Sequence, residues 1–261
     1  MPKLGIRLES LGLALRAALS EAARLGVSGV QIDSTGDLHP DRLTQTGRRE
    51  FRNLLRSHNL QLTALGCPLR RGLDTGEDQE PRLEFVRKAL TLSFDLGARI
   101  VVADMPPLPT EGDVVRQRLL RDALIDLGAH GDRIGATLAL ETGLDSPEAL
   151  AEYFRRFDHG SLRVNYDPAN LLVNGHDPIA GLTPLRPFLA HVHARDAQRG
   201  RASRTAQETT LGAGDIDWMA FMAVLDTFEY RGWVVVERES GDNRRGDIAA
   251  GVAFLRRFLR P

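Results

Sequence analysis

Two histidines and three acidic residues stand at the ends of short apolar runs, where a buried strand would reach the surface. One run leads into His191 and His193, and alternation along a strand directs both imidazoles to the same face. Three other apolar runs end in a carboxylate, at Glu141, Asp167 and Glu237. Imidazole and carboxylate groups bind divalent ions, so these side chains are candidate ligands of a metal centre.

The spacing of these residues favours a shared site. Glu141, Asp167 and His193 follow one another at intervals of 26 residues, close to one strand–helix unit, and Glu237 comes 44 residues later. Taken singly, each acid could be an ordinary polar residue at a strand end; four in register on consecutive strands indicate one ion. Three carboxylates with one imidazole suit Mn²⁺ or Mg²⁺ first, and Co²⁺ or Zn²⁺ after them.

Strand and helix patterns alternate along the chain, which favours parallel β-α units. Short apolar runs predict eight strands, at 4–8, 30–32, 60–65, 100–103, 138–140, 162–164, 189–192 and 233–236. Helical periodicity and capping residues predict eight helices, near 11–25, 40–57, 81–97, 112–130, 146–157, 177–187, 217–225 and 247–258. This count predicts a single (β/α)8 TIM barrel over residues 1–261, whose carboxyl strand ends meet in one pocket. A doubly wound open sheet would require a glycine-rich turn after an early strand, which residues 9–12 lack.

Composition narrows the class of protein. A formal net charge of −1 argues against a nucleic-acid binder that relies on a basic face. A single cysteine, Cys67, excludes an internal disulfide framework, and neither a signal pattern nor an apolar run of membrane length is present. We therefore expect a cytoplasmic protein with no membrane partner. The only lysines, Lys3 and Lys88, do not end a predicted strand, which argues against Schiff-base chemistry.

Five short motifs carry a resemblance to a known family across essentially the whole chain. They are Leu140-Glu141-Thr142, Tyr166-Asp167-Pro168-Ala169-Asn170, the segment from His191 to Asp196, the segment from Leu211 to Trp218, and Val236-Glu237-Arg238. In order and spacing the chain resembles the xylose isomerase-like TIM barrels, the sugar phosphate isomerase/epimerase superfamily. The resemblance implies that Glu141, Asp167, His193 and Glu237 bind the metal, and that Glu141 and Glu237 form a proton-transfer pair.

The chemistry implied is proton abstraction next to a carbonyl, through an enediolate that a divalent ion stabilises. Arg199, six residues after His193, matches an arginine that contacts substrate in the family's epimerases, although an exposed loop arginine is an equal alternative. Three more arginines crowd the same loop, at Arg195, Arg201 and Arg204. If this cluster faces the pocket, it favours an anionic or phosphorylated substrate.

Two further residues are candidate substrate contacts. Asn170 stands three residues after Asp167, where the family's sugar 3-epimerases usually carry histidine. Its amide can hydrogen-bond a hydroxyl but cannot shuttle a proton, which leaves the particular reaction open. His191 shares the predicted inner face with His193.

The leading hypothesis is a metal-dependent isomerase or epimerase of a small sugar or sugar derivative. Inosose dehydratase-like lyase chemistry and a non-catalytic sugar-binding barrel remain alternatives. An endonuclease IV-like DNA repair enzyme is disfavoured, because its zinc cluster needs more strand-end histidines than this chain offers. We expect a small-molecule sugar as the partner, and a second copy of the chain could cover apolar residues in the loop at 105–108.

Overall fold

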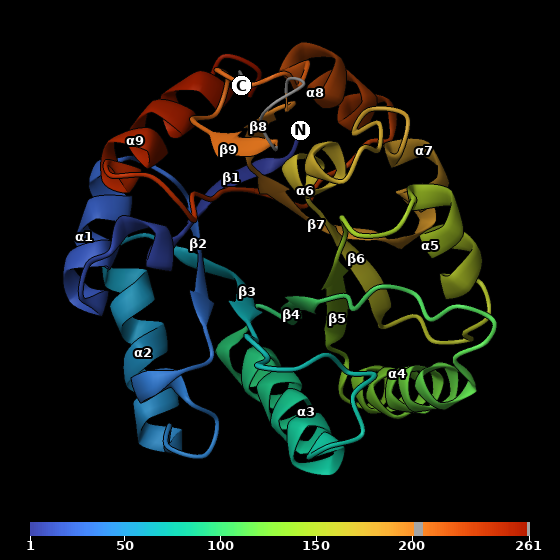
Figure 1. The fold of residues 1–261 in the computed structure, drawn as a ribbon. Helices are drawn as coiled ribbons and strands as arrows, with labels where there is room; N and C mark the ends of the chain where they lie inside the picture. The colour runs from blue at the N-terminus through green and yellow to red at the C-terminus, as the bar shows by residue number, and fades with distance from the viewer. Residues whose placement is uncertain (201–205, 260–261) are drawn as a thin grey trace.

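Eight parallel strands close into a barrel at the centre of the computed structural model, which describes residues 1–200 and 206–259 (Figure 1). The barrel strands are β1 (Lys3–Arg7), β2 (Gly29–Asp33), β3 (Gln61–Gly66), β4 (Ile100–Asp104), β5 (Thr137–Glu141), β6 (Leu162–Tyr166), β7 (Leu189–Ala194) and β10 (Trp233–Val236). Their order around the barrel is β1-β10-β7-β6-β5-β4-β3-β2, and every neighbouring pair is parallel. The predicted TIM barrel is confirmed.

The helices form a ring outside the strands (Figure 1). They are α1 (Leu15–Arg24), α2 (Gln45–Ser57), α3 (Gln79–Leu96), α4 (Val114–Ile134), α5 (Pro147–Phe154), α6 (Pro168–Val173), α7 (Leu182–Leu185), α8 (Trp218–Thr227) and α9 (Arg244–Leu255). Three short 3-10 helices join them, η1 (Leu8–Leu11), η2 (Gly36–Leu38) and η3 (Arg186–Phe188). No described helix combines the length and apolar character needed to cross a membrane.

Local sequence explains where the strands and helices begin and end. All four residues of β10, a tryptophan followed by three valines, are buried, as expected of a parallel strand covered on both faces. Helices α3 and α4 stop at Gly97 and Gly135, whose φ angles are 93° and 75°. Glycine adopts this left-handed conformation without a steric penalty, and in both places the chain then enters the next strand.

Two predicted helices start later than expected. The helix predicted at 11–25 begins at Leu15, because η1 comes first and ends at Gly12 with a φ of 63°. The helix predicted at 40–57 begins at Gln45, where the Thr44 hydroxyl accepts a hydrogen bond from the Gly47 amide at 3.2 Å. In both places a local turn or cap overrides the apolar periodicity.

The connections near the carboxyl strand ends differ most from the prediction. The irregular helix expected at 177–187 is the pair α7 and η3, and α6 before it was not predicted. The insertion between β7 and α8 contains an antiparallel hairpin of β8 (Asp196–Gln198) and β9 (Gln207–Thr209). The buried carboxylate of Asp196 accepts hydrogen bonds from the amides of Gly212 and Gly214 and from the indole of Trp218, which ties this insertion to the barrel.

Most of the apolar core lies between the strands and the helices. Inside the barrel the apolar contacts are confined to a small cluster that contains Ala64, Val102 and Ala139. Small side chains there leave room above them for the polar groups of the strand ends. Met105, expected in an exposed loop, is buried, so it does not provide apolar surface for a second copy.

Candidate active site

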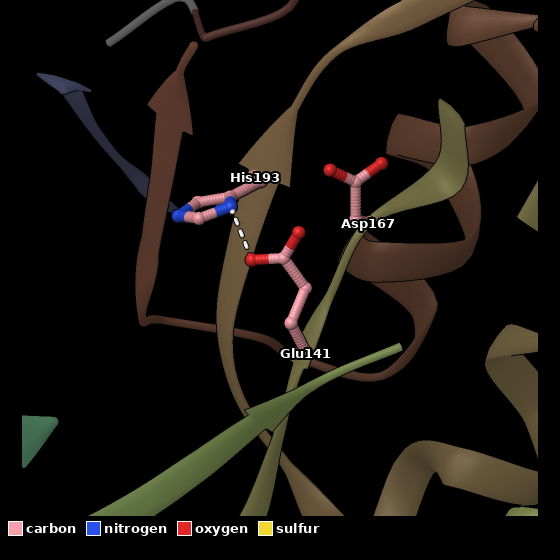
Figure 2. Close-up of side chains that lie close together, drawn as sticks. All are labelled: Glu141, Asp167 and His193. Atoms are coloured by element: carbon pink, nitrogen blue, oxygen red, sulfur yellow. Dashed lines mark ion pairs between the residues drawn. The ribbon is translucent and has the colours of Figure 1, made fainter. Parts of the chain in front are cut away.

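Three of the four predicted metal ligands converge at the carboxyl ends of adjacent strands (Figure 2). Glu141 ends β5, Asp167 directly follows β6, and His193 lies in β7. One donor atom from each of these three residues, which we call the triad, falls within 4.8 Å of the others, and this is close enough for one ion. The same-face prediction for the two histidines is also confirmed, since the rings of His191 and His193 lie 5.4 Å apart in the barrel interior.

Asp167 is fixed by its place at the start of a helix. Its Oδ1 accepts a hydrogen bond from the Asn170 amide at 2.8 Å and so caps α6, whose first residue is Pro168. Its Oδ2 accepts a hydrogen bond from Arg195 at 3.1 Å. Burial raises the pKa of Asp167 to about 7, and the charge of Glu141 adds to the increase against the opposing effect of Arg195. One oxygen therefore serves the fold while the other faces the site.

His193 is held by a polar side chain on each ring nitrogen. Nε2 lies 2.8 Å from Oε1 of Gln31, so donation to that oxygen leaves Nδ1 directed toward the carboxylates. Nδ1 lies 3.1 Å from Glu141 Oε2 and 2.7 Å from Glu237 Oε2. Burial favours the neutral ring, but the carboxylates of Glu237 and Glu141 outweigh it and raise the pKa of His193 to about 10.

Glu237, the fourth predicted ligand, lies against His193 rather than within the triad. Its Oε1 accepts a hydrogen bond from Arg7, and its buried Oε2 lies 2.7 Å from Nδ1 of His193. Burial favours the neutral carboxyl, but His193 and Arg7 outweigh it and hold the pKa of Glu237 well below its usual range. A buried, ionised oxygen beside three other donors fits a divalent cation.

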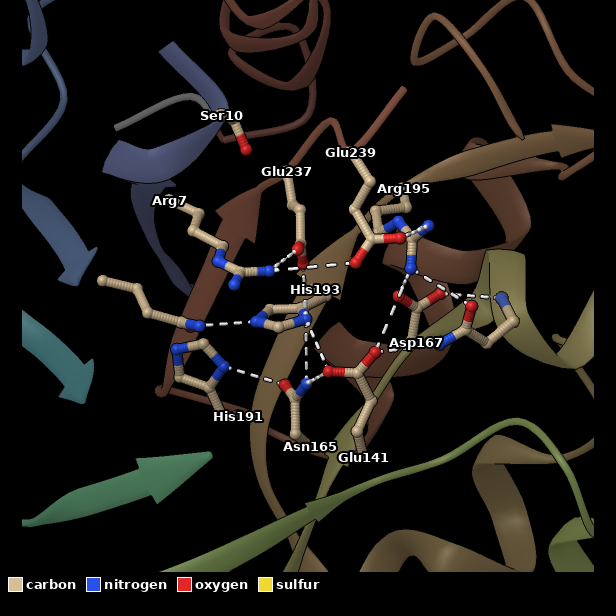
Figure 3. Close-up of polar contacts among 12 residues, drawn as sticks. Arg7, Ser10, Glu141, Asn165, Asp167, His191, His193, Arg195, Glu237 and Glu239 are labelled. Carbon is tan, nitrogen blue, oxygen red and sulfur yellow. Dashed lines mark hydrogen bonds and ion pairs between the residues drawn. The ribbon is translucent and has the colours of Figure 1, made fainter. Parts of the chain in front are cut away.

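His191 precedes His193 on β7 and contacts other side chains of the barrel interior. It is fully buried, with Nδ1 2.8 Å from Asn165 Oδ1 and Nε2 3.4 Å from the Thr63 hydroxyl. The Asn165 amide nitrogen in turn lies 3.0 Å from both Glu141 Oε2 and His193 Nδ1 (Figure 3). These contacts connect His191 to the site through Asn165, which orients two of the donors.

Arg195 closes the other side of the site (Figure 3), where it donates a hydrogen bond to Asn170. Asn170 donates to Glu141 Oε1 at 2.8 Å and accepts from Arg195 at 3.1 Å. The buried guanidinium of Arg195 also pairs with Glu208 of the hairpin at 3.3 Å and with Glu239 at 2.7 Å. Asn170 thus contacts Glu141, one of the candidate metal ligands, and Arg195 neutralises several acids at once.

Arg199 lies elsewhere. It lines a separate hollow of about 440 Å³ together with His176 and Asp177, and its backbone amide donates to Asp215 at 2.7 Å. Two other members of the predicted arginine cluster, Arg201 and Arg204, lie outside the described residues. The described part of the cluster therefore does not line the cavity beside the triad.

A cavity of about 240 Å³ adjoins Glu141 and His193, with room for about eight waters or one small sugar. Besides Glu239, which was also not predicted, it is bordered by three charged residues that the sequence analysis did not identify, Arg7, Asp33 and Asp104. Each ends a barrel strand, β1, β2 or β4, so the signal that identified Glu141 could have found them.

Comparisons with known proteins agree with this architecture. A family model described as "Xylose isomerase-like TIM barrel" matches residues 19–258. Among curated proteins, an inosose dehydratase of Clostridium beijerinckii is 23% identical over 252 residues, which cover 85% of this chain and 81% of that protein.

Solved structures share the fold along nearly the whole chain. A xylose isomerase domain protein from Planctomyces limnophilus superposes with a TM-score of 0.86 and 24% identity, covering 98% of this chain and 96% of that one. A D-allulose 3-epimerase from Methylomonas sp. gives 0.78 and 18%, covering 99% and 98%. A xylose isomerase-like barrel from Mycobacterium smegmatis in complex with magnesium gives 0.80 and 17%, covering 99% and 97%. Dehydratases and epimerases are enzymes, in agreement with the prediction that this chain is one.

Proposed function

This chain belongs to the xylose isomerase-like TIM barrel family, as its motifs predicted, and on that premise we propose that it is a divalent-metal-dependent isomerase or epimerase of a small sugar or sugar derivative. The observation that carries the proposal is the approach of two carboxylates, from Glu141 and Glu237, to one nitrogen of His193, at 3.1 and 2.7 Å. Glu141 lines the cavity and Glu237 lies against its neighbour His193, so the two acids can act in turn on one substrate carbon.

The carboxylates supply the proton transfer. One of them takes the proton from the carbon next to the substrate carbonyl, and Glu141 and Glu237 are the candidates because both lie against His193. The electron pair of the broken C–H bond forms a carbon–carbon double bond, and the carbonyl oxygen takes the charge of an enediolate. Return of a proton to the opposite face of the same carbon gives an epimer. Return of a proton to the neighbouring carbon, with transfer of the hydroxyl proton to the former carbonyl oxygen, gives an isomer.

We propose Glu141, Asp167, His193 and Glu237 as the ligands of one ion. Three carboxylates with one imidazole support Mn²⁺ or Mg²⁺, and the magnesium complex of the Mycobacterium smegmatis barrel agrees with this choice. When bound, the ion would stabilise the negative charge that develops on substrate oxygens.

A dehydratase is the second candidate, favoured by the curated relative named inosose dehydratase. Its first step is the same proton abstraction. The enediolate then re-forms the carbonyl, and its carbon–carbon double bond shifts to join the deprotonated carbon and the next carbon, from which hydroxide leaves. A protonated carboxylate gives its proton to this hydroxide and completes the water. The fate of the enediolate distinguishes the two reactions.

The test is incubation of the Mn²⁺-loaded protein with ketoses, aldoses and an inosose in D₂O, followed by NMR. Deuterium incorporation next to the carbonyl without loss of water supports an isomerase or epimerase, and water loss from the inosose supports a dehydratase. Glu141→Gln and Glu237→Gln should each lower the rate by about 10³-fold.

The matched control is Glu152→Gln, an exposed glutamate of α5 whose ion pair with Arg156 spans 3.6 Å, and it should keep the parental rate. Neither exchange nor dehydration across the panel, with Mn²⁺, Mg²⁺, Co²⁺ or Zn²⁺ present, would reject the enzymatic proposal. Sugar binding without turnover would then support the non-catalytic barrel.

A further inference from the structure

The cavity beside the triad has an excess of carboxylates. Among the described residues, four acids line it, Asp33, Asp104, Glu141 and Glu239, whereas Arg7 is the one guanidinium group. Asp33 and Glu141 come from strand ends on different sides of the opening, so the negative groups are distributed around the cavity rather than gathered on one strand.

The guanidinium groups near the cavity are already paired with acids of this chain. Arg7 binds Glu237 with one terminal nitrogen and both oxygens of Asp33 with the other, at 3.0 and 3.2 Å. Arg195 pairs with Asp167 and Glu239. Apart from the proposed metal ion, the cations open to a substrate phosphate or carboxylate are these guanidinium groups, which it would have to take from their present partners.

Asp104 differs from the other acids of the cavity. It ends β4, and its Cα is the register partner of Glu141 on β5, so its side chain belongs beside a predicted metal ligand. It is solvent-exposed at the cavity, and its carboxylate has no hydrogen bond or ion pair with any described residue. Asp33 by contrast is paired with Arg7. A Cβ at position 66 would come within 2.1 Å of the Asp33 carboxylate, so the lack of a side chain at Gly66 leaves the space that this carboxylate occupies.

We propose that Asp104 is a specificity-determining residue, which accepts a hydrogen bond from a hydroxyl or ammonium group of the substrate, and that the cavity rejects phosphate and carboxylate groups at this end. The inference rests on the proposed function and adds the substrate class. An ionised carboxylate can only accept hydrogen bonds, so it stabilises a bound hydrogen-bond donor and repels an anion across a partly buried space. A neutral or cationic substrate is the opposite of the anionic or phosphorylated substrate that the sequence favours if the arginine cluster faces the pocket.

The experiment measures binding to the Mn²⁺-loaded protein by calorimetry at physiological ionic strength. The probes are the neutral ketoses D-fructose, D-tagatose and D-allulose, with the 1- and 6-amino and the 1- and 6-phosphate derivatives of fructose. We expect each phosphate to bind at least about tenfold more weakly than its neutral parent, and one amino derivative to bind at least as tightly as the parent. Asp104→Asn should reduce the phosphate discrimination by about threefold or more and remove the advantage of the amine.

Asp122→Asn is the matched control, because it removes the same charge from the outer face of α4, where Asp122 pairs only with its neighbour Arg121 among the described residues. Phosphates that bind more tightly than neutral sugars, or an unchanged discrimination in Asp104→Asn, would overturn the charge selection alone. Absence of binding by every probe would instead remove the proposed function on which the inference rests.

Discussion

The two halves of the barrel mouth hold their charges in different ways. The half formed by β5, β6, β7 and β10, which we name the ligand half, carries Glu141, Asp167, His193 and Glu237, and the last three are all but fully buried. The half formed by β1, β2 and β4, which we name the cavity half, carries Arg7, Asp33 and Asp104, which retain solvent contact. One half is enclosed by its own partners, and the other is open toward a ligand.

The difference indicates that the two halves have separate roles: the ligand half fixes the candidate metal ligands, and the cavity half stays open to a substrate. Burying a charge is unfavourable unless partners surround it, so the ligand half holds its donors in a dense network through Asn165, Asn170 and Arg195. Such a network fixes geometry before any ligand binds. The cavity half needs less pairing because water reaches it, and its unpaired acceptor at Asp104 stays available to a substrate.

The largest expected difference between the halves is in metal affinity. Asp167→Asn removes a ligand charge but keeps a side chain that caps α6 well, so the fold should survive. We expect its Mn²⁺ affinity to fall by about 100-fold or more, beyond the effect of losing an outer-shell partner. Asp33→Asn, the same change in the cavity half, should stay within about threefold of the parent.

Isothermal titration calorimetry of both variants and the parent decides this prediction. Equal losses in the two variants would show that the ion does not sit where the ligand half places it. Retention of full affinity in Asp167→Asn would remove this residue from the set of ligands.

The sequence predicted the ligand half better than the cavity half for a physical reason. Glu141, Asp167 and Glu237 each follow an apolar run, and a carboxylate after such a run contrasts strongly with the strand. Asp33 and Asp104 follow the same kind of run. The distance between them along the chain does not repeat the 26-residue interval of Glu141, Asp167 and His193, so it did not indicate a common site. Gln31 lies within a strand, and only the closed barrel reveals that it contacts His193.

Loop geometry was the least predictable part of the site. The strand count and fold follow from periodicity, which reports burial along one element. Whether Arg199 and Arg195 face the same space depends on the path of the insertion after β7, which long-range contacts such as Arg195 with Glu208 determine. Two arginines that are close in the sequence therefore lie in different environments, Arg195 at the triad and Arg199 at a separate hollow.

The second-largest expected effect is on the free energy of unfolding and concerns the contact between the two halves of the barrel mouth. Arg7 of the cavity half pairs with buried Glu237 of the ligand half, so Arg7→Met would leave that carboxylate without its guanidinium. We expect the free energy of unfolding of the metal-free protein to fall by about 2 kcal/mol, less than for a wholly buried pair because the Arg7 side chain is 22% exposed. Urea denaturation measures this, and Mn²⁺ should restore part of the loss.

An exposed ion pair provides the control for Arg7→Met. Arg121→Met removes a guanidinium whose partner Asp122 lies on the same outer helix face, and the free energy of unfolding should change by less than about 1 kcal/mol. If the two variants lose the same amount, the pairing across the halves contributes nothing special to stability.

The smallest effect is pH-dependent and belongs to the cavity half. Glu9, in η1, accepts the Asp33 amide at 2.8 Å, while its other oxygen has no hydrogen-bond partner among the described residues. Burial and the charge of Asp33 raise the pKa of Glu9 from 4.5 to about 7. The folded state therefore binds the proton more tightly than the unfolded chain, so ionising Glu9 destabilises the fold as the pH rises from about 4.5 to 7.

Glu9→Gln should remove this destabilisation, because a neutral amide still accepts the Asp33 amide hydrogen bond. With 36% of the Glu9 side chain exposed, solvent screening limits the expected gain to about 1 kcal/mol at pH 8, and the gain should shrink as the pH falls from about 7 to 4.5. Urea denaturation of parent and variant across this range measures it. A variant less stable than the parent at pH 8 would mean that the attraction between Glu9 and Arg7 outweighs burial, and that the cavity half is paired as fully as the ligand half.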